Sequence, residues 1–333
     1  MPLTLNETIA NARGGRRPAS TALASAPPAI WIVLAGLTAL EAAHEVLGIG
    51  GPDALFSDWI HGGVLVAAAI LCLARGHYEP RDRAVSLTFG TGLACWAAGE
   101  VTWSVLHGGD PEPPYPTVSD ALWLAWYPFT AAGFALLIRR HVQRFALDRW
   151  MDGVAVMLIA LTPCAALLLA PAAEASHQGT FAAVVNFSYP VLDALLVGAV
   201  LGVCGLMAWR PGRTWILLGL GCAVMAVSDG LFSVQEARDA VAVGGYDFTW
   251  PAGTLLIAYA VWQSVSLPGV RPEPAGWRAI ALPLAAQVIA AGIQVYGLFA
   301  ELGRIERVVT LIVLVVAMVQ IVVSRPRGAA PGG

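Results

Sequence analysis

The sequence contains no lysine and has few charged residues of any kind. Only 12% of its 333 residues are charged, and all 19 basic residues are arginine. A soluble domain carries about 25% charged residues. This chain is instead 57% hydrophobic, with a mean hydropathy of +0.69. The composition therefore argues against a soluble globular protein, and the lack of a basic patch argues against a nucleic-acid partner.

Signatures of catalysis and of cofactor binding are also missing. The five cysteines lie inside apolar runs and do not have the spacing of a disulfide framework or a zinc site. The chain has no Walker A loop, no G-x-S-x-G motif and no H-E-x-x-H motif. We therefore expect that the protein is not an enzyme, and the sequence identifies neither a cofactor nor a metal.

Apolar blocks of about 20 residues, the length that crosses a bilayer core as a helix, recur along the chain. They predict an all-α integral membrane protein whose polytopic domain covers residues 29–324 in the lipid bilayer. Residues 1–28 form a predicted disordered tail, and residues 325–333 form a short second tail. The ten predicted spans are 29–49, 58–75, 84–106, 118–138, 150–172, 182–208, 214–234, 249–267, 279–299 and 308–324.

The arginines predict the orientation of these spans. If the N-terminus is cytoplasmic, sixteen of the 19 arginines fall on the inner side, and only Arg238, Arg304 and Arg307 fall outside. Such a split follows the positive-inside rule. We therefore expect both termini to face the cytoplasm.

An internal repeat joins two of the predicted spans. GTGLACWAAGEVTWSV (90–105) aligns without gaps to GLGCAVMAVSDGLFSV (219–234), and six positions are identical. The alignment places Glu100 on Asp229. An aromatic–proline pair opens the helix that follows each segment. Because the two spans run in the same direction, the sequence predicts a partial parallel repeat with units near 84–138 and 214–267.

Acidic residues are the candidate functional groups, because ionisable side chains at membrane depth are costly and mark functional paths. All of them except Asp152 fall in the predicted outer half. No arginine or lysine accompanies them, so we expect them to be protonated, hydrogen-bonded, hydrated or bound to a cation. The seven acids within or beside predicted spans are Glu41, Glu45, Glu100, Asp120, Asp152, Asp193 and Asp229.

In the first span, Glu41, His44 and Glu45 share one helix face. Glu-x-x-His is the ligand spacing of di-iron bundles, but such sites need two copies and the chain has one. A metal or proton site and a merely polar packing face both stay open.

The other candidates are Glu100 and Asp229, at equivalent repeat positions, and Asp193, which follows Pro190 in the sixth span. Pro190 itself predicts a kink or a break in that helix. Together with the acids and histidine of the first span, these residues predict a ligand or cation site. The alternative for each is a hydrogen bond between helices, and for Asp120 it is a helix cap.

The segments GEVTW, PYPTVSDALWLAWYPFTAAGFALLIRR and SYPVLDALL carry a resemblance to a known group of proteins. Over residues 30–324 the chain resembles the multi-helix N-terminal membrane region of bacterial GGDEF/EAL cyclic-di-GMP signalling proteins and of some sensor kinases. The resemblance implies a sensory input module in the bacterial inner membrane. The output domain would begin after about residue 324, so no cyclase, phosphodiesterase or kinase activity is carried over.

Such a module would act through a separate cytoplasmic signalling partner. Two alternatives stay open beside it. One is a transporter of a cation or small solute that uses the same acids, and the other is a structural membrane protein with no ligand.

Overall fold

The structure is a computed structural model, and every regular element in its described part is a helix. It describes residues 26–108, 110, 113–141, 180–207, 211–237 and 245–263, with Leu311 and Val315. The predicted all-α class is confirmed. The elements are α2 (Pro28–Leu47), a π-helical turn η2 (Leu55–Ile60), α3 (His61–Tyr78), α4 (Arg83–His107), α5 (Val118–His141), α8 (Thr180–Leu206), α9 (Arg213–Ala237) and α10 (Thr249–Trp262).

Seven of the ten predicted spans coincide with these helices, apart from small shifts at their ends. The predicted spans 150–172 and 279–299 and almost all of 308–324 lie outside the described residues, as do Asp152 and most of both predicted tails. α8 is one helix from Thr180 to Leu206 that includes Pro190, so the chain does not break at the proline.

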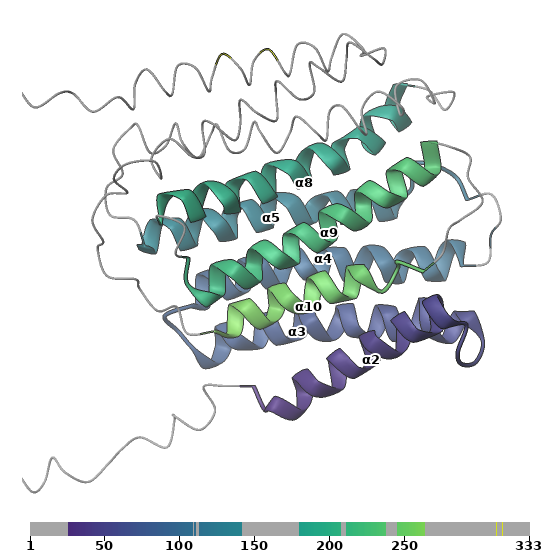
Figure 1. The fold of residues 1–333 in the computed structure, drawn as a ribbon, viewed down its shortest axis with the longest axis horizontal. Helices are drawn as coiled ribbons and strands as arrows, with labels where there is room; N and C mark the ends of the chain where they lie inside the picture. The colour runs from purple at the N-terminus through teal and green to yellow at the C-terminus, as the bar shows by residue number, and fades with distance from the viewer. Residues whose placement is uncertain are drawn as a thin grey trace, which may run out of the picture.

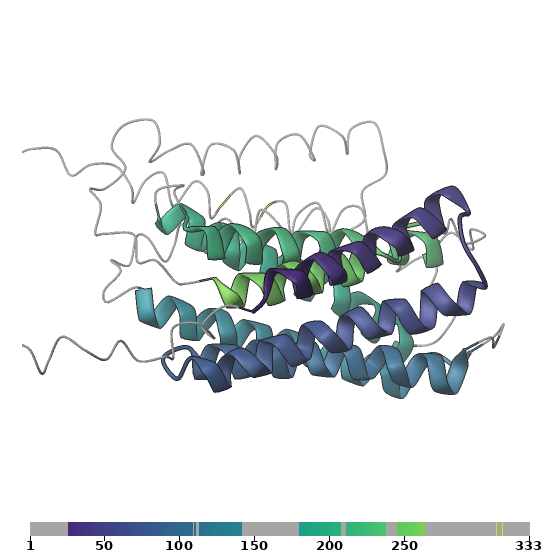
Figure 2. The ribbon, with the colours of Figure 1, turned by 90° about the horizontal axis from the view of Figure 1, so that it is seen from below.

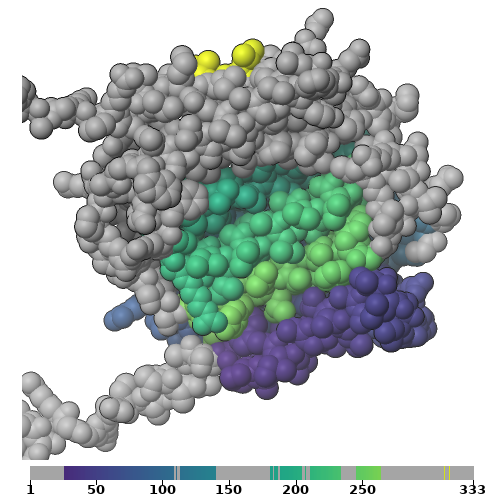
Figure 3. Space-filling view, viewed as in Figure 1, coloured from purple at the N-terminus to yellow at the C-terminus, as the bar shows by residue number. Residues whose placement is uncertain are grey.

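Within the described residues, five helical stretches are long and apolar enough to cross a bilayer, which indicates a multi-pass membrane protein. They are Pro28–Leu47, Leu55–Tyr78, Val118–Arg139, Val184–Cys204 and Arg213–Ser233. Helix α2 also carries large exposed apolar side chains, among them Ile32 and Leu47. Figure 3 shows α2 on the surface beside α10. Exposed apolar side chains of this kind suit contact with lipid.

The helices pack as two sets of three. In one set α4 lies between α3 and α5, and in the other α9 lies between α8 and α10. The sets meet through α5 with α8 and through α10 with α3, while α2 packs beside α3 and α10. Figures 1 and 2 show the two sets as neighbouring layers of helices that run roughly alongside one another.

Two glycines hold α4 close to both of its neighbours. A Cβ added at Gly90 would lie 2.8 Å from the Leu73 side chain on α3, and one added at Gly92 would lie 3.1 Å from the Phe129 Cβ on α5. Any larger side chain would force the helices apart, so these glycines set the close approach of the backbones.

The corresponding glycines of α9 do the same. A Cβ at Gly219 would lie 2.8 Å from Val200 on α8, and one at Gly221 would lie 2.6 Å from Ile257 on α10. In each set, the first glycine therefore faces the preceding helix and the second faces the following one.

The turn between α2 and η2 positions the start of α3. Gly48 ends α2 in the left-handed conformation (φ 64°), and Gly50 follows with φ 129°. A Cβ at Gly50 would lie 2.6 Å from the ring of Phe56, which stacks on His44 with ring centroids 3.9 Å apart. This tight reversal places His61, the first residue of α3, beside the end of α2.

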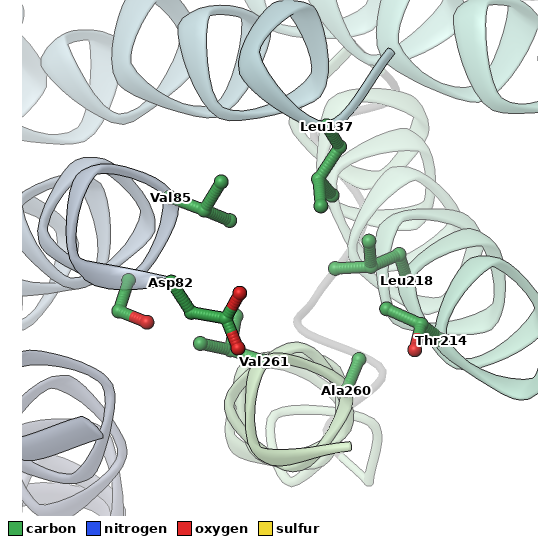
Figure 4. Close-up of a pocket in the computed structure, with 8 residues that line it drawn as sticks. Asp82, Val85, Leu137, Thr214, Leu218, Ala260 and Val261 are labelled. Atoms are coloured by element: carbon green, nitrogen blue, oxygen red, sulfur yellow. The ribbon is translucent and has the colours of Figure 1, made fainter. Parts of the chain in front are cut away.

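The opposite end of the bundle carries arginines. Buried Arg75 lies 3.4 Å from a carboxylate oxygen of Asp82 and packs over the ring of Trp262. Figure 4 shows a cavity at this end, lined by side chains of α4, α5, α9 and α10 together with Asp82. Its volume of about 10 Å³ is the space of one water molecule.

Candidate acid-rich site

The predicted site residues gather at one end of the bundle, where α2, α4 and α9 finish and α3, α5 and α10 begin. Four of the six predicted residues fall into two buried networks. We call Glu41, His61 and Glu100 the histidine network, and Tyr127, Asp193, Asp229 and Trp250 the aspartate network.

In the histidine network, an imidazole lies between two carboxylates from different helices. His61 Nδ1 lies 2.7 Å from Glu41 Oε1, and His61 Nε2 lies 3.3 Å from Glu100 Oε1. Glu41 is 0% exposed and His61 is 3% exposed. The contact of Nε2 has the distance of an ion pair but not the geometry of a hydrogen bond. Because both ring nitrogens face carboxylate oxygens, the arrangement suits an imidazolium, which has a hydrogen on each nitrogen. A protonated His61 would give the network its own cation.

This arrangement corrects one part of the sequence interpretation. No arginine or lysine was expected beside the acids, but His61 was overlooked as a basic side chain that contacts Glu41 and Glu100. The π-helical turn η2 comes directly before His61, and such turns are frequent at functional sites. The position of His61 on the predicted outer side was the signal that could have revealed it.

In the aspartate network, a single tyrosine hydroxyl faces two carboxyl groups. Tyr127 Oη lies 3.0 Å from Asp193 Oδ1 and 3.1 Å from Asp229 Oδ2. The indole Nε1 of Trp250 donates to Asp229 Oδ1 at 2.6 Å. Asp193 is 5% exposed and Asp229 is 7% exposed. A tyrosine hydroxyl has one hydrogen, so it can donate fully to only one of the two carboxyl groups.

The aspartate network contains no cation. Among the described residues, no arginine or histidine forms an ion pair with Asp193 or Asp229. One Tyr127 hydroxyl contacts both carboxyl groups, so the two groups lie close together. The second oxygen of Asp193, Oδ2, is buried and accepts no hydrogen bond. Two buried carboxylates this close cannot both be ionised without a compensating positive charge.

The two networks lie near each other. Glu100 of the first lies within electrostatic range of Asp229 in the second. Asp247, in the turn before α10, lies within range of both His61 and Glu100. Burial raises the pKa of Asp247, the charge of His61 opposes that rise, and Glu100 adds to it. The cluster as a whole therefore contains more carboxyl groups than basic side chains.

The other two candidates of the first span, Glu45 and His44, contact different parts of the molecule. Glu45 accepts a hydrogen bond from the backbone N–H of Phe248 at 3.3 Å, so it ties α2 to the start of α10. His44 instead lies 3.2 Å from the exposed carboxylate of Asp53. Within the described ranges, no group of three or more histidine, cysteine, aspartate or glutamate side chains could hold a metal ion. The Glu-x-x-His spacing therefore does not assemble a metal site with other described residues.

Asp120 caps α5, which is the alternative that the sequence left open for it. Its Oδ2 accepts hydrogen bonds from the backbone N–H and the hydroxyl of Thr117, at 2.7 and 3.1 Å. This is the reciprocal half of a capping box, in which the side chain at the third helical position reaches back to the cap residue. Its Oδ1 also accepts a hydrogen bond from Tyr189 on α8 at 2.9 Å.

Sequence reasoning missed His61, Tyr127, Trp250 and Asp247 as members of the site. The two aromatic residues were noted only as parts of the pairs Tyr127-Pro128 and Trp250-Pro251, which mark the predicted repeat. Their places in helices that follow the two acid-bearing segments of the repeat were the available signal.

Comparison with known proteins adds no family to this description. The chain matches no family model, and neither the curated proteins nor the solved structures gave a match.

Proposed function

We propose that this chain is a membrane sensory or signalling input module whose receptor site is the acid cluster. The observation that carries the proposal is the pair of buried carboxyl groups, Asp193 and Asp229, from adjacent helices and without a cation of their own. Such a pair needs a ligand, a cation or a proton to be stable in a low-dielectric interior. Occupancy of the pair then changes how α8 and α9 pack.

The layout of the bundle favours a sensor over a transporter. A transporter needs a polar path to both faces, whereas most buried side chains between the two ends of the described bundle are apolar. Leu93, Trp126, Cys222, Met225 and Ile257 are buried between the acid cluster and the arginine-bearing end. The input module would therefore transmit a change of helix packing rather than pass a solute.

The orientation and the repeat belong to the same proposal. The acid end faces outward from a bacterial inner membrane, both termini lie in the cytoplasm, and a separate cytoplasmic partner reads the arginine-bearing end. The units α3–α4–α5 and α8–α9–α10 form the repeat. Support comes from the matching glycine contacts and from the reciprocal packing of α5 with α8 and of α10 with α3.

The test is a stability screen of the full chain in lipid nanodiscs. Thermal unfolding is measured across pH and with added metal ions and small solutes, for the wild type and for Glu100→Gln combined with Asp229→Asn. Asp53→Asn, which changes an exposed acid at the same end, is the matched control. We expect at least one condition to stabilise the wild type and the control but not the double variant. Equal responses of all three proteins would contradict the proposal.

The transporter alternative has its own readout. Proteoliposomes that enclose a pH-sensitive dye should show no proton flux above that of empty liposomes. A flux that Asp229→Asn abolishes would favour the transporter.

A further inference from the structure

We propose that the ligand of the aspartate network is a proton held between Asp193 and Asp229, with Asp193 as the protonated partner. The physiological meaning of this proton rests on the proposed sensory function. The proton itself follows from the contacts of four side chains, and it is argued and tested separately.

The first step is a count of hydrogens. Three polar contacts join this network: Tyr127 with each aspartate, and Trp250 with Asp229. Tyr127 and Trp250 supply one hydrogen each. Two hydrogens cannot satisfy all of these contacts when both carboxyl groups are ionised acceptors. One further hydrogen, on one of the two aspartates, completes the set.

The second step identifies which carboxyl group holds it. Asp229 accepts from Trp250 at 2.6 Å and from Tyr127 at 3.1 Å, so donors stabilise its negative charge on both oxygens. Asp193 has only the Tyr127 contact, and its Oδ2 is buried without a partner. A hydrogen on Asp193 removes the charge that nothing else stabilises.

The third step concerns the charges around the pair. Among the described residues, the groups that face the pair from neighbouring elements are acidic or neutral, so none of these compensates a second negative charge. They are Glu100 on α4, Tyr127 on α5, Tyr189 on α8, Cys222 on α9, Trp250 on α10, and Tyr246 before α10. His61 on α3 contacts Glu41 and Glu100 instead, and Asp247 lies near His61 and Glu100.

Loss of the proton has a mechanical consequence. Asp193 and Asp229 lie on adjacent helices, and their ionised forms repel each other strongly in a low-dielectric interior. Tyr127 and Trp250 link the same pair to α5 and α10. Deprotonation therefore pushes α8 and α9 apart. Because the pair is linked to α5 and α10, all four helices are affected.

The test is infrared spectroscopy of the full chain in nanodiscs, with carboxyl-labelled [4-¹³C]aspartate. A protonated carboxylic acid has a C=O stretch well separated from that of a carboxylate. We expect the wild type to show a ¹³C-shifted band of a protonated aspartate at neutral pH, and the band to disappear as the pH rises. Labelled glutamate should leave that band unshifted.

Variants assign the band. Asp193→Asn, which is isosteric with the protonated acid, should remove it, whereas Asp53→Asn should keep it. The absence of a protonated aspartate band in the wild type would overturn the proposal, and so would a band that survives in Asp193→Asn. The wild-type titration needs no variant, so the proposal remains testable if Asp193→Asn fails to fold.

The infrared experiment and the stability screen can overturn the proton site and the sensory function separately. If a protonated aspartate is found but no condition in the screen stabilises the wild type more than the double variant, the proton site is kept and the sensory function is overturned. Acid-dependent stabilisation by a metal or solute without a protonated aspartate would keep a receptor and overturn the proton as its ligand.

Discussion

The histidine network and the aspartate network lie at the same end of the bundle, and each buries two carboxyl groups from different helices. In the first, His61 lies between Glu41 and Glu100 and brings a positive charge that the chain itself supplies. In the second, Tyr127 and Trp250 bring donors but no charge. His61 thus offers an internal partner to the acids of one network, whereas our proposal supplies the other network with a proton from outside. On that proposal, the histidine network joins α2, α3 and α4, and the aspartate network is the part that responds.

Removal of the internal cation should have the largest effect. In His61→Gln, buried Glu41 and partly buried Glu100 lose their positive partner. Loss of one member of a buried ion pair costs about 3–5 kcal/mol. We expect a correspondingly large fall in the free energy of unfolding, measured by denaturant titration in detergent micelles.

The control for this change is His77→Gln, which alters an exposed histidine at the other end of α3. Adding Glu41→Gln to His61→Gln should recover part of the loss, because it removes one of the stranded charges. Equal stability of His61→Gln and His77→Gln would mean that the histidine network contains no essential ion pair.

The two aspartates should respond unequally to the same substitution. Asp229→Asn removes the charged acceptor of two hydrogen bonds, each worth about 1.5–3 kcal/mol to a charged group. Asp193→Asn replaces a neutral acid by a neutral amide and should cost much less. Thermal unfolding of both variants at neutral pH measures the difference, and the reverse order would place the proton on Asp229.

A finer comparison concerns two tryptophans. Trp250→Phe keeps a large ring and removes the donor to Asp229, which should cost about 1–2 kcal/mol. Trp123→Phe is the matched control, because the Nε1 of Trp123 is buried without a hydrogen-bond partner and its loss should be close to neutral. Equal costs in an unfolding titration would show that ring packing, not the hydrogen bond, is the function of Trp250.

The smallest effect should come from Asp247, which lies near both His61 and Glu100. Its raised pKa means that the fold favours the protonated acid. Its contribution to stability is therefore full at low pH and declines as the pH rises above the ordinary aspartate value and through the raised one. Asp247→Asn should flatten this part of the stability–pH curve. A steeper curve in the variant would mean that the fold favours the ionised form of Asp247, which contradicts the expectation.

The helices and the acids could be read from the sequence, but their pairing could not. Apolar runs of about 20 residues identify spans because backbone hydrogen bonds must be satisfied within the helix. Buried Glu41, Glu100, Asp193 and Asp229 stand out because acids are rare in such runs.

Which groups meet depends on how helices far apart in the chain rotate and pack. Tyr127 and Asp229 are separated by 102 positions, and His61 and Glu41 by 20. The repeat alignment placed Glu100 and Asp229 at equivalent positions, and the sequence predicted that both belong to one ligand or cation site. In the structure they lie within electrostatic range of each other, yet each binds a different set of partners. No spacing rule along the sequence distinguishes these outcomes.

The contrast between the two networks depends most directly on the charge of His61. Nitrogen NMR of the chain labelled with ¹⁵N-histidine, in nanodiscs at neutral pH, reports whether each ring nitrogen carries a hydrogen, and the response to Glu41→Gln assigns the signal. The account predicts that both nitrogens of His61 are protonated. A neutral His61, with one bare ring nitrogen, would leave both networks without a cation of their own and would contradict the account.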